Sequence, residues 1–272
     1  MVFLSGMIAI MFFWPFGKKK NGLTLGGGVA RGIAHIGVLK VIEQYKIPID
    51  FIAGTSSGAI VGAAYASGLE IRLIEEIALR ISWTRILKLA FFRPGLISAT
   101  AIEELLVKYV GDKIFSDLKI PFVAVATDIR TGEEVLLRRG KVAKAVAASS
   151  AFPGLFAPEE INKRFLVDGG LANNLPVAPA RQMGAERVIA VDVVPAQPVK
   201  HLPKDPFQAF GRSLDLALHK MSLKQRASAD ILVDPEIDDD IWHLDLHKAK
   251  RLIAAGEATA HKALRKLGKL YR

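Results

Sequence analysis

The chemistry that this sequence could perform centres on one serine. Ser56 lies in the stretch Gly54-Thr55-Ser56-Ser57-Gly58, whose G-x-S-x-G spacing permits the strained turn that presents a serine hydroxyl above a sheet. The apolar run before this stretch and the small-residue run after it predict a strand and a helix on its two sides. Only Ser56 has a glycine both two residues before it and two residues after it, so Ser57 is expected to cap the helix or to pack. The alternative is a tight turn whose serine only caps the helix.

A serine is a weak nucleophile at neutral pH and needs a base within hydrogen-bond reach. Asp168 is a candidate, because it ends a short apolar run and precedes Gly169 and Gly170, a setting that exposes a carboxylate at a sheet edge. The alternative for Asp168 is an Asx turn. The order of residues along the chain also permits a histidine as the base. However, none of the six histidines lies in a strand-end loop of catalytic character, and His35 is expected to pack. The histidines are His35, His201, His219, His243, His247 and His261.

A glycine-rich loop, Gly26-Gly27-Gly28-Val29-Ala30-Arg31-Gly32, lies between a predicted strand and a predicted helix. Such a loop could cradle the phosphates of a dinucleotide on its backbone N–H groups. Two observations argue against a dinucleotide site. A G-x-G-x-x-G pattern that starts at Gly26 has Arg31 in place of its last glycine. The second predicted strand ends in the serine stretch, whereas a dinucleotide site needs an acid there to bind a ribose hydroxyl. The same N–H groups could instead form an oxyanion hole, which acyl transfer needs.

Strands and helices alternate along the chain, with no internal repeat or break in composition, which predicts one α/β domain with a mostly parallel sheet. The loop over 150–158 is aromatic and bounded by proline, and 195–206 is the stretch expected to be flexible. The predicted strands are 23–25, 49–53, 122–127, 133–138, 165–167, 187–194 and 231–233. The predicted helices are 33–47, 57–68, 69–110 with a break at Arg93-Pro94-Gly95 beside Phe91-Phe92, 142–149 and 176–183.

Composition excludes several kinds of site and indicates the charge of the partner. The absence of cysteine excludes disulfides, cysteine-based zinc sites, iron–sulfur clusters and a thiol nucleophile. The formal net charge of +10 favours a polyanion, either anionic lipid or nucleic acid. No nucleic-acid-binding module accompanies the basic residues. The most basic part, Leu244 to Arg272, has eight Lys or Arg against Asp245 and Glu257, and its simplest interpretation is a solvated helix face.

The first 20 residues form an apolar and then basic segment. Residues 1–16 are apolar at 13 positions but fall short of the roughly 20 residues that a membrane span needs. Lysines 18–20 follow the apolar run rather than precede it, which argues against a secretory signal. Two interpretations stay open: a shallow hydrophobic anchor with the lysines at the headgroups, or a true start at Met7 or Met11. Residues 21–272 are assigned to the domain, with 195–272 as its basic-tailed C-terminal extension.

The three glycine-containing motifs, in this order, make the chain resemble the patatin-like phospholipase family, in particular its small bacterial members. The resemblance extends from Gly22 to Val194, and the combination of motifs is far more specific than any one of them. The residues that carry it are Gly27 to Gly32, Ala34-His35-Ile36-Gly37-Val38-Leu39, Gly54 to Gly58, Thr127-Asp128, Thr131-Gly132-Glu133, Ala151-Phe152-Pro153-Gly154, Asp168 to Gly170, Asn174 and Pro176.

The resemblance implies a three-layer α/β/α fold and a Ser–Asp dyad without histidine, with Ser56 as nucleophile and Asp168 as base. It assigns the oxyanion hole to the loop of Gly27, Gly28, Val29, Arg31 and Gly32, in which Arg31 holds the loop or the anion. No metal or cofactor is implied. Val29 stands where many members have a third glycine; its N–H survives, but we expect the loop to lose its freedom at positive φ.

The implied function is hydrolysis of lipid acyl esters through an acyl-enzyme on Ser56. The implied partners are a lipid or acyl-ester substrate and the surface of an anionic membrane, which the basic tail and Phe12, Phe13, Trp14 and Phe16 would suit. We expect a cytoplasmic protein, peripheral at the inner face of the membrane, that binds no nucleic acid. The alternatives are a non-enzymatic lipid-binding module of the same fold, a thioesterase or general carboxylesterase, and a nucleotide-binding α/β protein.

Overall fold

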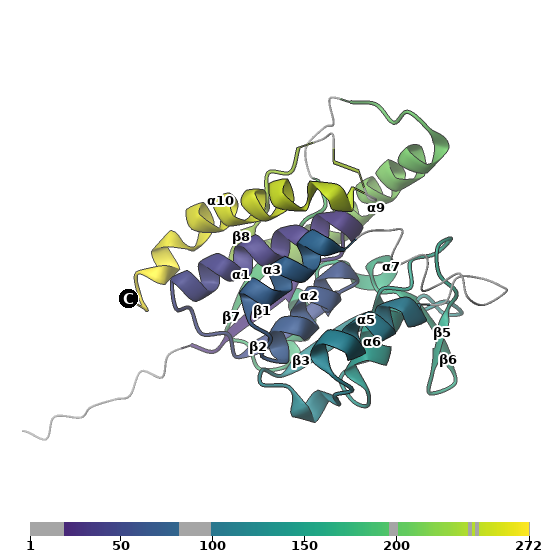
Figure 1. The fold of residues 1–272 in the computed structure, drawn as a ribbon, viewed down its shortest axis with the longest axis horizontal. Coiled ribbons are helices and arrows are strands. Elements are labelled where there is room, and N and C mark those ends of the chain that lie inside the picture. Colours follow the sequence, from purple (N-terminus) through teal and green to yellow (C-terminus); the bar gives the residue numbers. More distant parts are fainter. Residues whose placement is uncertain (1–18, 82–98, 196–200, 239–240, 243–244, 272) are drawn as a thin grey trace, which may run out of the picture.

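The fold is built on one mixed sheet of eight strands in the part of the chain that the computed structural model describes, residues 19–81, 99–195, 201–238, 241–242 and 245–271 (Figure 1). The strands are β1 (Asn21–Leu25), β2 (Phe51–Thr55), β3 (Phe122–Asp128), β4 (Glu134–Leu137), β5 (Glu159–Ile161), β6 (Arg164–Asp168), β7 (Arg187–Val191) and β8 (Ile231–Val233). The hydrogen-bonded neighbours follow the path β5-β6-β3-β2-β1-β7-β8, and β4 also pairs with β3. Strands β8, β7, β1, β2 and β3 run parallel, and β4, β5 and β6 are antiparallel additions.

Helices cover both faces of the sheet, which confirms the three-layer α/β/α fold. The large apolar core lies on one face beneath α1, α2, α3, α5, α6 and α10, and a smaller core lies on the other face beneath α8, which α9 contacts. The helices are α1 (Ala34–Gln44), α2 (Ser57–Ala66), α3 (Ile71–Arg80), α5 (Thr100–Val110), α6 (Val142–Ser149), α7 (Gly170–Asn173), α8 (Val177–Gln182), α9 (Pro206–Ser228) and α10 (Ala249–Gly268). Short 3-10 turns are η1 (Val29–Ile33), η2 (Phe115–Asp117) and η3 (Leu246–Lys248).

One edge of β3 carries two strands that point at each other. On this edge β2 pairs in parallel, with Thr55 opposite Val125, and β6 pairs antiparallel, with Asp168 opposite Ala126. Strand β4 occupies the other edge at both of these β3 residues. The end of β2 and the end of β6 therefore meet at consecutive residues of β3, so the residue after Thr55 lies beside Asp168.

The segment after residue 181 belongs to the same sheet. Strand β7 pairs with β1 and strand β8 pairs with β7, both in parallel, and α10 packs along α1. At that crossing a β-carbon on Gly256 would lie 2.0 Å from the Ala34 carbonyl oxygen, and one on Gly37 would lie 2.0 Å from the Ile253 carbonyl oxygen. Only glycine at both positions permits the two helix backbones to approach so closely.

Most of the expected elements are confirmed, within a few residues at their ends. The elements predicted from the sequence did not include β5, α7 or the 23-residue helix α9. Expectations for residues 1–18, for the break at Arg93-Pro94-Gly95 and for 196–200 lie outside the described residues. Among the described helices, none has the length and apolar character that would carry it through a bilayer.

Candidate active site

Ser56 occupies a strained turn between β2 and α2. Its φ is +53° and its ψ is −124°, a conformation that non-glycine residues rarely adopt. The turn is tight enough that a β-carbon on Gly54 would lie 2.7 Å from the Cα atom of Ala59, and one on Gly58 would lie 2.1 Å from the Leu25 carbonyl oxygen. The two glycines of the serine motif therefore let α2 begin directly against the sheet, with the Ser56 side chain at the end of β2.

The Ser56 hydroxyl donates a hydrogen bond of 2.5 Å to Oδ2 of Asp168. Both residues are buried, with exposed fractions of 7% and 6%. Burial raises the pKa of Asp168 to about 6, although the hydrogen bonds from Ser56 and from the Gly170 N–H to the carboxylate act in the opposite direction. The pair thus combines a hydroxyl with a carboxylate whose basicity is raised by its surroundings.

Ser149 fixes this turn to the sheet, and sequence reasoning missed it. Its hydroxyl accepts a hydrogen bond of 3.0 Å from the Ser56 N–H and donates one of 2.5 Å to the Val125 carbonyl oxygen. The hydroxyl of Thr127 donates to the Asp168 carbonyl oxygen at 2.9 Å. The backbones of Ser56 and Asp168 are therefore tied to β3 or its neighbour α6. Local sequence gave no signal for Ser149, which lies 93 residues from Ser56.

The N–H groups of the glycine loop differ in whether they have an acceptor. The Gly27 N–H donates to the Asn174 carbonyl oxygen at 3.2 Å, and the Gly28 N–H donates to the Ser57 hydroxyl at 3.1 Å. The Val29 N–H has no acceptor among the residues that the structure describes. Gly32 leaves room for Ser57, because a β-carbon there would lie 2.2 Å from the Ser57 Oγ.

The expectation that Val29 would cost the loop its positive φ is wrong. Val29 itself adopts a φ of +52°. A β-branched residue in this region is an outlier, and the surrounding structure must compensate a strain of about 1–3 kcal/mol. The loop therefore keeps the backbone path that a glycine would give it, and its N–H at residue 29 stays unpaired within the described chain.

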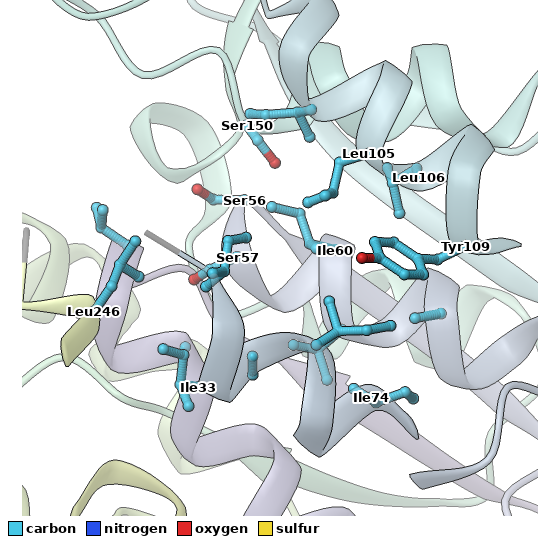
Figure 2. Close-up of a pocket in the computed structure, with 18 of the residues that line it drawn as sticks. Ile33, Ser56, Ser57, Ile60, Ile74, Leu105, Leu106, Tyr109, Ser150 and Leu246 are labelled. Carbon is cyan, nitrogen blue, oxygen red and sulfur yellow. The ribbon is translucent and has the colours of Figure 1, made fainter. Parts of the chain in front are cut away.

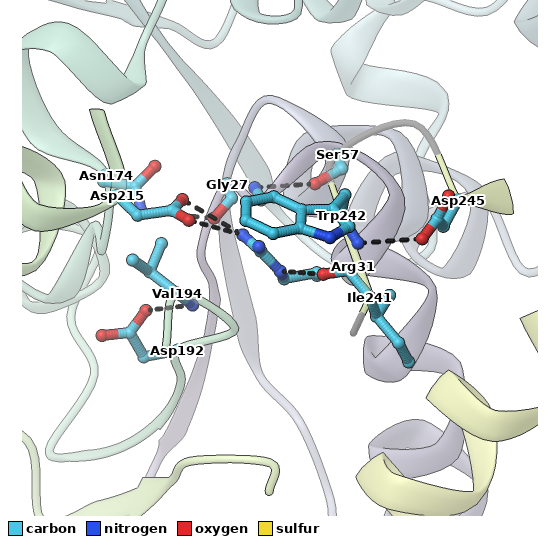
Figure 3. A network of polar contacts seen from close by, with 11 residues as sticks. Gly27, Arg31, Ser57, Asn174, Asp192, Val194, Asp215, Ile241, Trp242 and Asp245 are labelled. Atoms are coloured by element: carbon cyan, nitrogen blue, oxygen red, sulfur yellow. Dashed lines mark hydrogen bonds and ion pairs between the residues drawn. The ribbon is translucent and has the colours of Figure 1, made fainter. Parts of the chain in front are cut away.

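The Arg31 side chain points toward α9. Its Nη1 donates to both carboxylate oxygens of Asp215, at 2.9 and 3.1 Å, and its Nε donates to the Ile241 carbonyl oxygen at 3.3 Å (Figure 3). Both charged side chains are buried, with exposed fractions of 5% and 2%. Arg31 was expected to hold either the glycine loop or the anion, and these contacts match the first of these roles.

No histidine in the described residues bonds to Ser56 or Asp168. His35 is buried in α1, and its Nε2–H donates to the Gly26 carbonyl oxygen at 2.7 Å. Burial lowers the pKa of His35 to about 4, so the ring is neutral and packs as expected. Within the described part of the chain, no group of three or more His, Asp or Glu is arranged to hold a metal ion.

Ser56 lines two hollows. An apolar cavity of about 190 Å³ extends from Ser56 and Ser57 past Ile60 to Tyr109, between α2, α3 and α5 (Figure 2). Dry cavities of comparable size take up small hydrocarbons. A second, small recess is lined by the glycine loop, Asp168 and Asn174, and it is closed by Leu214 and Leu218 of α9.

Comparison with known proteins finds related sequences, two of which are named as phospholipases. A mycobacterial protein, an uncharacterized NTE family protein of Mycobacterium tuberculosis, is 39% identical over 181 residues, which cover 65% of this chain and 49% of that protein. Human patatin-like phospholipase domain-containing protein 6 is 35% identical over 63% of this chain and 13% of its own length. Lysophospholipase NTE1 of Saccharomyces cerevisiae is 35% identical over 63% of this chain and 11% of its own length. The chain thus spans half or less of these relatives.

Two further comparisons concern the fold and the family. The crystal structure of VipD from Legionella pneumophila superposes with a TM-score of 0.54 at 14% identity, over 94% of this chain and 67% of that one. At this identity the likeness extends to the fold only. The family model of patatin-like phospholipase matches residues 23–181, more than half of the chain and the segment that holds both Ser56 and Asp168. The chain therefore belongs to the patatin-like phospholipase family.

Proposed function

We propose that this protein is a serine lipid acyl hydrolase in which Ser56 and Asp168 act as a catalytic dyad. The observation that carries the proposal is the 2.5 Å hydrogen bond from the Ser56 hydroxyl to the Asp168 carboxylate, at the end of an apolar cavity. Membership of a family whose members include a lysophospholipase supports the substrate class. The raised pKa of Asp168 supports its role as base, because a carboxylate with a pKa of about 6 is ionised at neutral pH yet more basic than usual.

In the first step Asp168 accepts the proton of Ser56 while Oγ attacks the ester carbonyl. The negative charge that forms on the carbonyl oxygen is stabilised by the N–H groups of Gly28 and Val29. Among the described residues, the Val29 N–H has no acceptor to lose, and the Gly28 N–H donates only to the rotatable hydroxyl of Ser57. Collapse of the intermediate transfers the Asp168 proton to the leaving alcohol and leaves an acyl ester on Ser56.

In the second step Asp168 accepts a proton from water, which attacks the acyl ester and releases the fatty acid. We assign the two parts of the substrate to the two hollows. The acyl chain lies in the apolar cavity toward Tyr109, where its methylenes are removed from water. The alcohol part leaves on the side of the recess, beneath Leu214 and Leu218 of α9.

The experiment that tests the dyad is labelling with a fluorophosphonate probe followed by peptide mass spectrometry. We expect an adduct on Ser56 that is absent in Ser56→Ala and strongly reduced in Asp168→Asn, while Ser57→Ala is still labelled. Ester hydrolysis should fall by at least about 10³-fold in the first two variants. Full activity in either variant would refute the dyad, and a folded protein that neither labels nor turns over would be a lipid-binding module.

A panel of substrates separates phospholipase from thioesterase and from general carboxylesterase, because all three share the chemistry of Ser56. The apolar lining between Ser56 and Tyr109 favours acyl chains over acetyl groups. We expect kcat/KM for oxygen esters to rise with acyl-chain length, and to rise with pH to a plateau, with its midpoint near pH 6. A preference for acetyl esters would favour the general carboxylesterase.

A further inference from the structure

The outward face of α9 is apolar although it is exposed. Four large side chains along this helix are about half exposed, at 54%, 47%, 50% and 52%: Phe210, Leu216, Met221 and Leu223. At 100° per residue they lie on the half of the helix that is turned away from the buried Asp215 and Leu218. None of the other described elements covers them, so they form an unpartnered apolar helix face, which we call the α9 face.

The charges on the α9 face are all positive. Lys220 and Lys224 lie between the apolar side chains, both exposed, and neither has an ion-pair partner among the described residues. Asp215 is the sole acid of α9, and it is buried against Arg31. An exposed apolar helix face with lysines and without acids is typical of helices that lie in a membrane interface. Its charge is complementary to anionic lipid and matches the net charge of +10.

The second basic helix, α10, has a different surface. Its apolar side chains, such as Leu252 and Leu264, are buried against α1 and the sheet. Part of its charge is neutralised within the chain, since Arg251 pairs with Asp238 and Lys262 pairs with Glu236. Helix α10 therefore has exposed cations but no large exposed apolar face within its bounds, and it fits the solvated helix face expected from its sequence.

The opposite side of α9 reaches the dyad. Leu214 and Leu218 line the recess that contains Ser56 and Asp168. The α9 face and the recess are thus separated by the thickness of one helix. Because the recess is where the alcohol part of the substrate leaves, a lipid whose alcohol part remained in a bilayer would lie on the α9 side of Ser56.

We propose that the α9 face is the surface by which this protein docks on anionic lipid bilayers. The inference rests on the proposed function for the direction from which the ester arrives, but the binding itself does not need turnover. Phe210, Leu216, Met221 and Leu223 insert into the acyl boundary, and Lys220 and Lys224 contact the anionic headgroups. Docking in this orientation places the recess over the bilayer.

The test is flotation with vesicles of phosphatidylcholine, with and without phosphatidylglycerol. The full chain should bind the anionic vesicles and be released as salt rises. Lys220→Gln with Lys224→Gln should weaken the binding by about 25-fold, since each lysine near an anionic surface contributes roughly a factor of five. A second variant, Phe210→Ser with Met221→Ser, should weaken vesicle binding by more than the lysine variant does. The matched control is Lys250→Gln with Lys266→Gln on α10, which removes the same charge and should bind like the wild type.

Hydrolysis of a soluble short-chain ester is measured on the same samples. Every variant should retain wild-type turnover of that ester, because none of the four substituted α9 residues lies in the dyad or the glycine loop. Unchanged vesicle binding in both α9 variants would overturn the proposal, and so would loss of binding in the α10 control alone. A wild-type dimer that becomes a monomer in the α9 variants would assign the face to a second copy. Absence of ester turnover in the wild type would defeat the proposed function but leave the vesicle result intact.

Discussion

The crossing of α1 and α10 is centred on glycines that pack in relaxed conformations. The site around Ser56 instead contains residues whose conformations and environments cost free energy. At the crossing, Gly37 and Gly256 let two helix backbones touch. At the site, Ser56 and Val29 both adopt positive φ without being glycine, and Asp168 is a buried carboxylate without a cationic partner among the described residues. The comparison separates a region selected for stability from one selected for chemistry.

This difference makes the sign of a mutational effect predictable. Substitutions at the crossing should destabilise the protein and leave the chemistry of Ser56 unchanged in the molecules that still fold. Substitutions that remove a strained or buried polar group at the site should stabilise the protein and reduce its activity. The Arg31–Asp215 pair lies between these regions, because it is buried like a core element and yet holds the glycine loop.

The largest effect is expected at the helix crossing. Gly256→Leu would force α10 away from Ala34, because its first side-chain carbon has no room, and should lower the free energy of unfolding by more than about 4 kcal/mol. Ala254→Leu, on the exposed side of the same helix, is the control and should change it by less than about 0.5 kcal/mol. Urea unfolding measures both. A Gly256→Leu variant within about 1 kcal/mol of the wild type would show that the close approach is not required.

The next effect concerns the buried ion pair. Asp215→Ala leaves the Arg31 guanidinium buried without its carboxylate and should cost about 3–5 kcal/mol of stability together with most of the activity. Replacing both charges, by Arg31→Met with Asp215→Leu, should restore most of the stability. If the pair positions the glycine loop, kcat of the double variant should stay low while KM changes little. Wild-type kcat in the double variant would reduce the pair to a structural role.

The third prediction is a gain of stability with a defined pH dependence. Burial raises the pKa of Asp168 to about 6 from its ordinary value of 3.8, so the folded state binds the proton more tightly than the unfolded state. Stability is therefore lost as pH rises from about 4 to about 6. Asp168→Asn should be more stable than the wild type by up to about 3 kcal/mol at pH 7, and by less as the pH approaches 4. Equal unfolding free energies across this pH range would contradict the raised pKa.

The smallest effect is expected at Val29. Val29→Gly should relieve the strain of φ +52°, and after the entropy cost of glycine the net gain in unfolding free energy is about 1 kcal/mol. Val29→Ala is the matched control, because it removes the same methyl groups but keeps the β-carbon and should give no such gain. Thermal melts of the two variants measure the difference. A melting temperature of Val29→Gly below that of Val29→Ala would mean that the strain is absent.

The sequence was sufficient to predict most of the sheet and to single out Ser56 and Asp168, which the structure joins by a hydrogen bond. Strands such as β3 and β7 are continuous apolar runs between turn residues, and that pattern depends only on local sequence. Ser56 and Asp168 were identified because each lies beside glycines that the chain path requires. Local sequence thus marked both residues, although the distance between them could be obtained only from the structure.

The contacts that complete the site were not predictable because they join distant parts of the chain. Asp215 lies 184 residues after Arg31, and nothing in the sequence of α9 marks it as a partner. Helix α9 itself was missed because apolar and basic residues follow each other around much of its surface, which weakens the 3.6-residue pattern. Val29 was misjudged because backbone strain depends on what the rest of the fold can compensate.

The meeting of β2 and β6 on one edge of β3 has a consequence for how this chain can vary in length. Both reactive side chains take their positions from Val125 and Ala126, so their separation is set by the register of one strand. The turn at Asn162 and Lys163, between β5 and β6, lies outside that register and is open to solvent. Residues can be added at this turn while β3 still aligns the two ends. The distance between Ser56 and Asp168 therefore does not depend on the length of the chain at this turn.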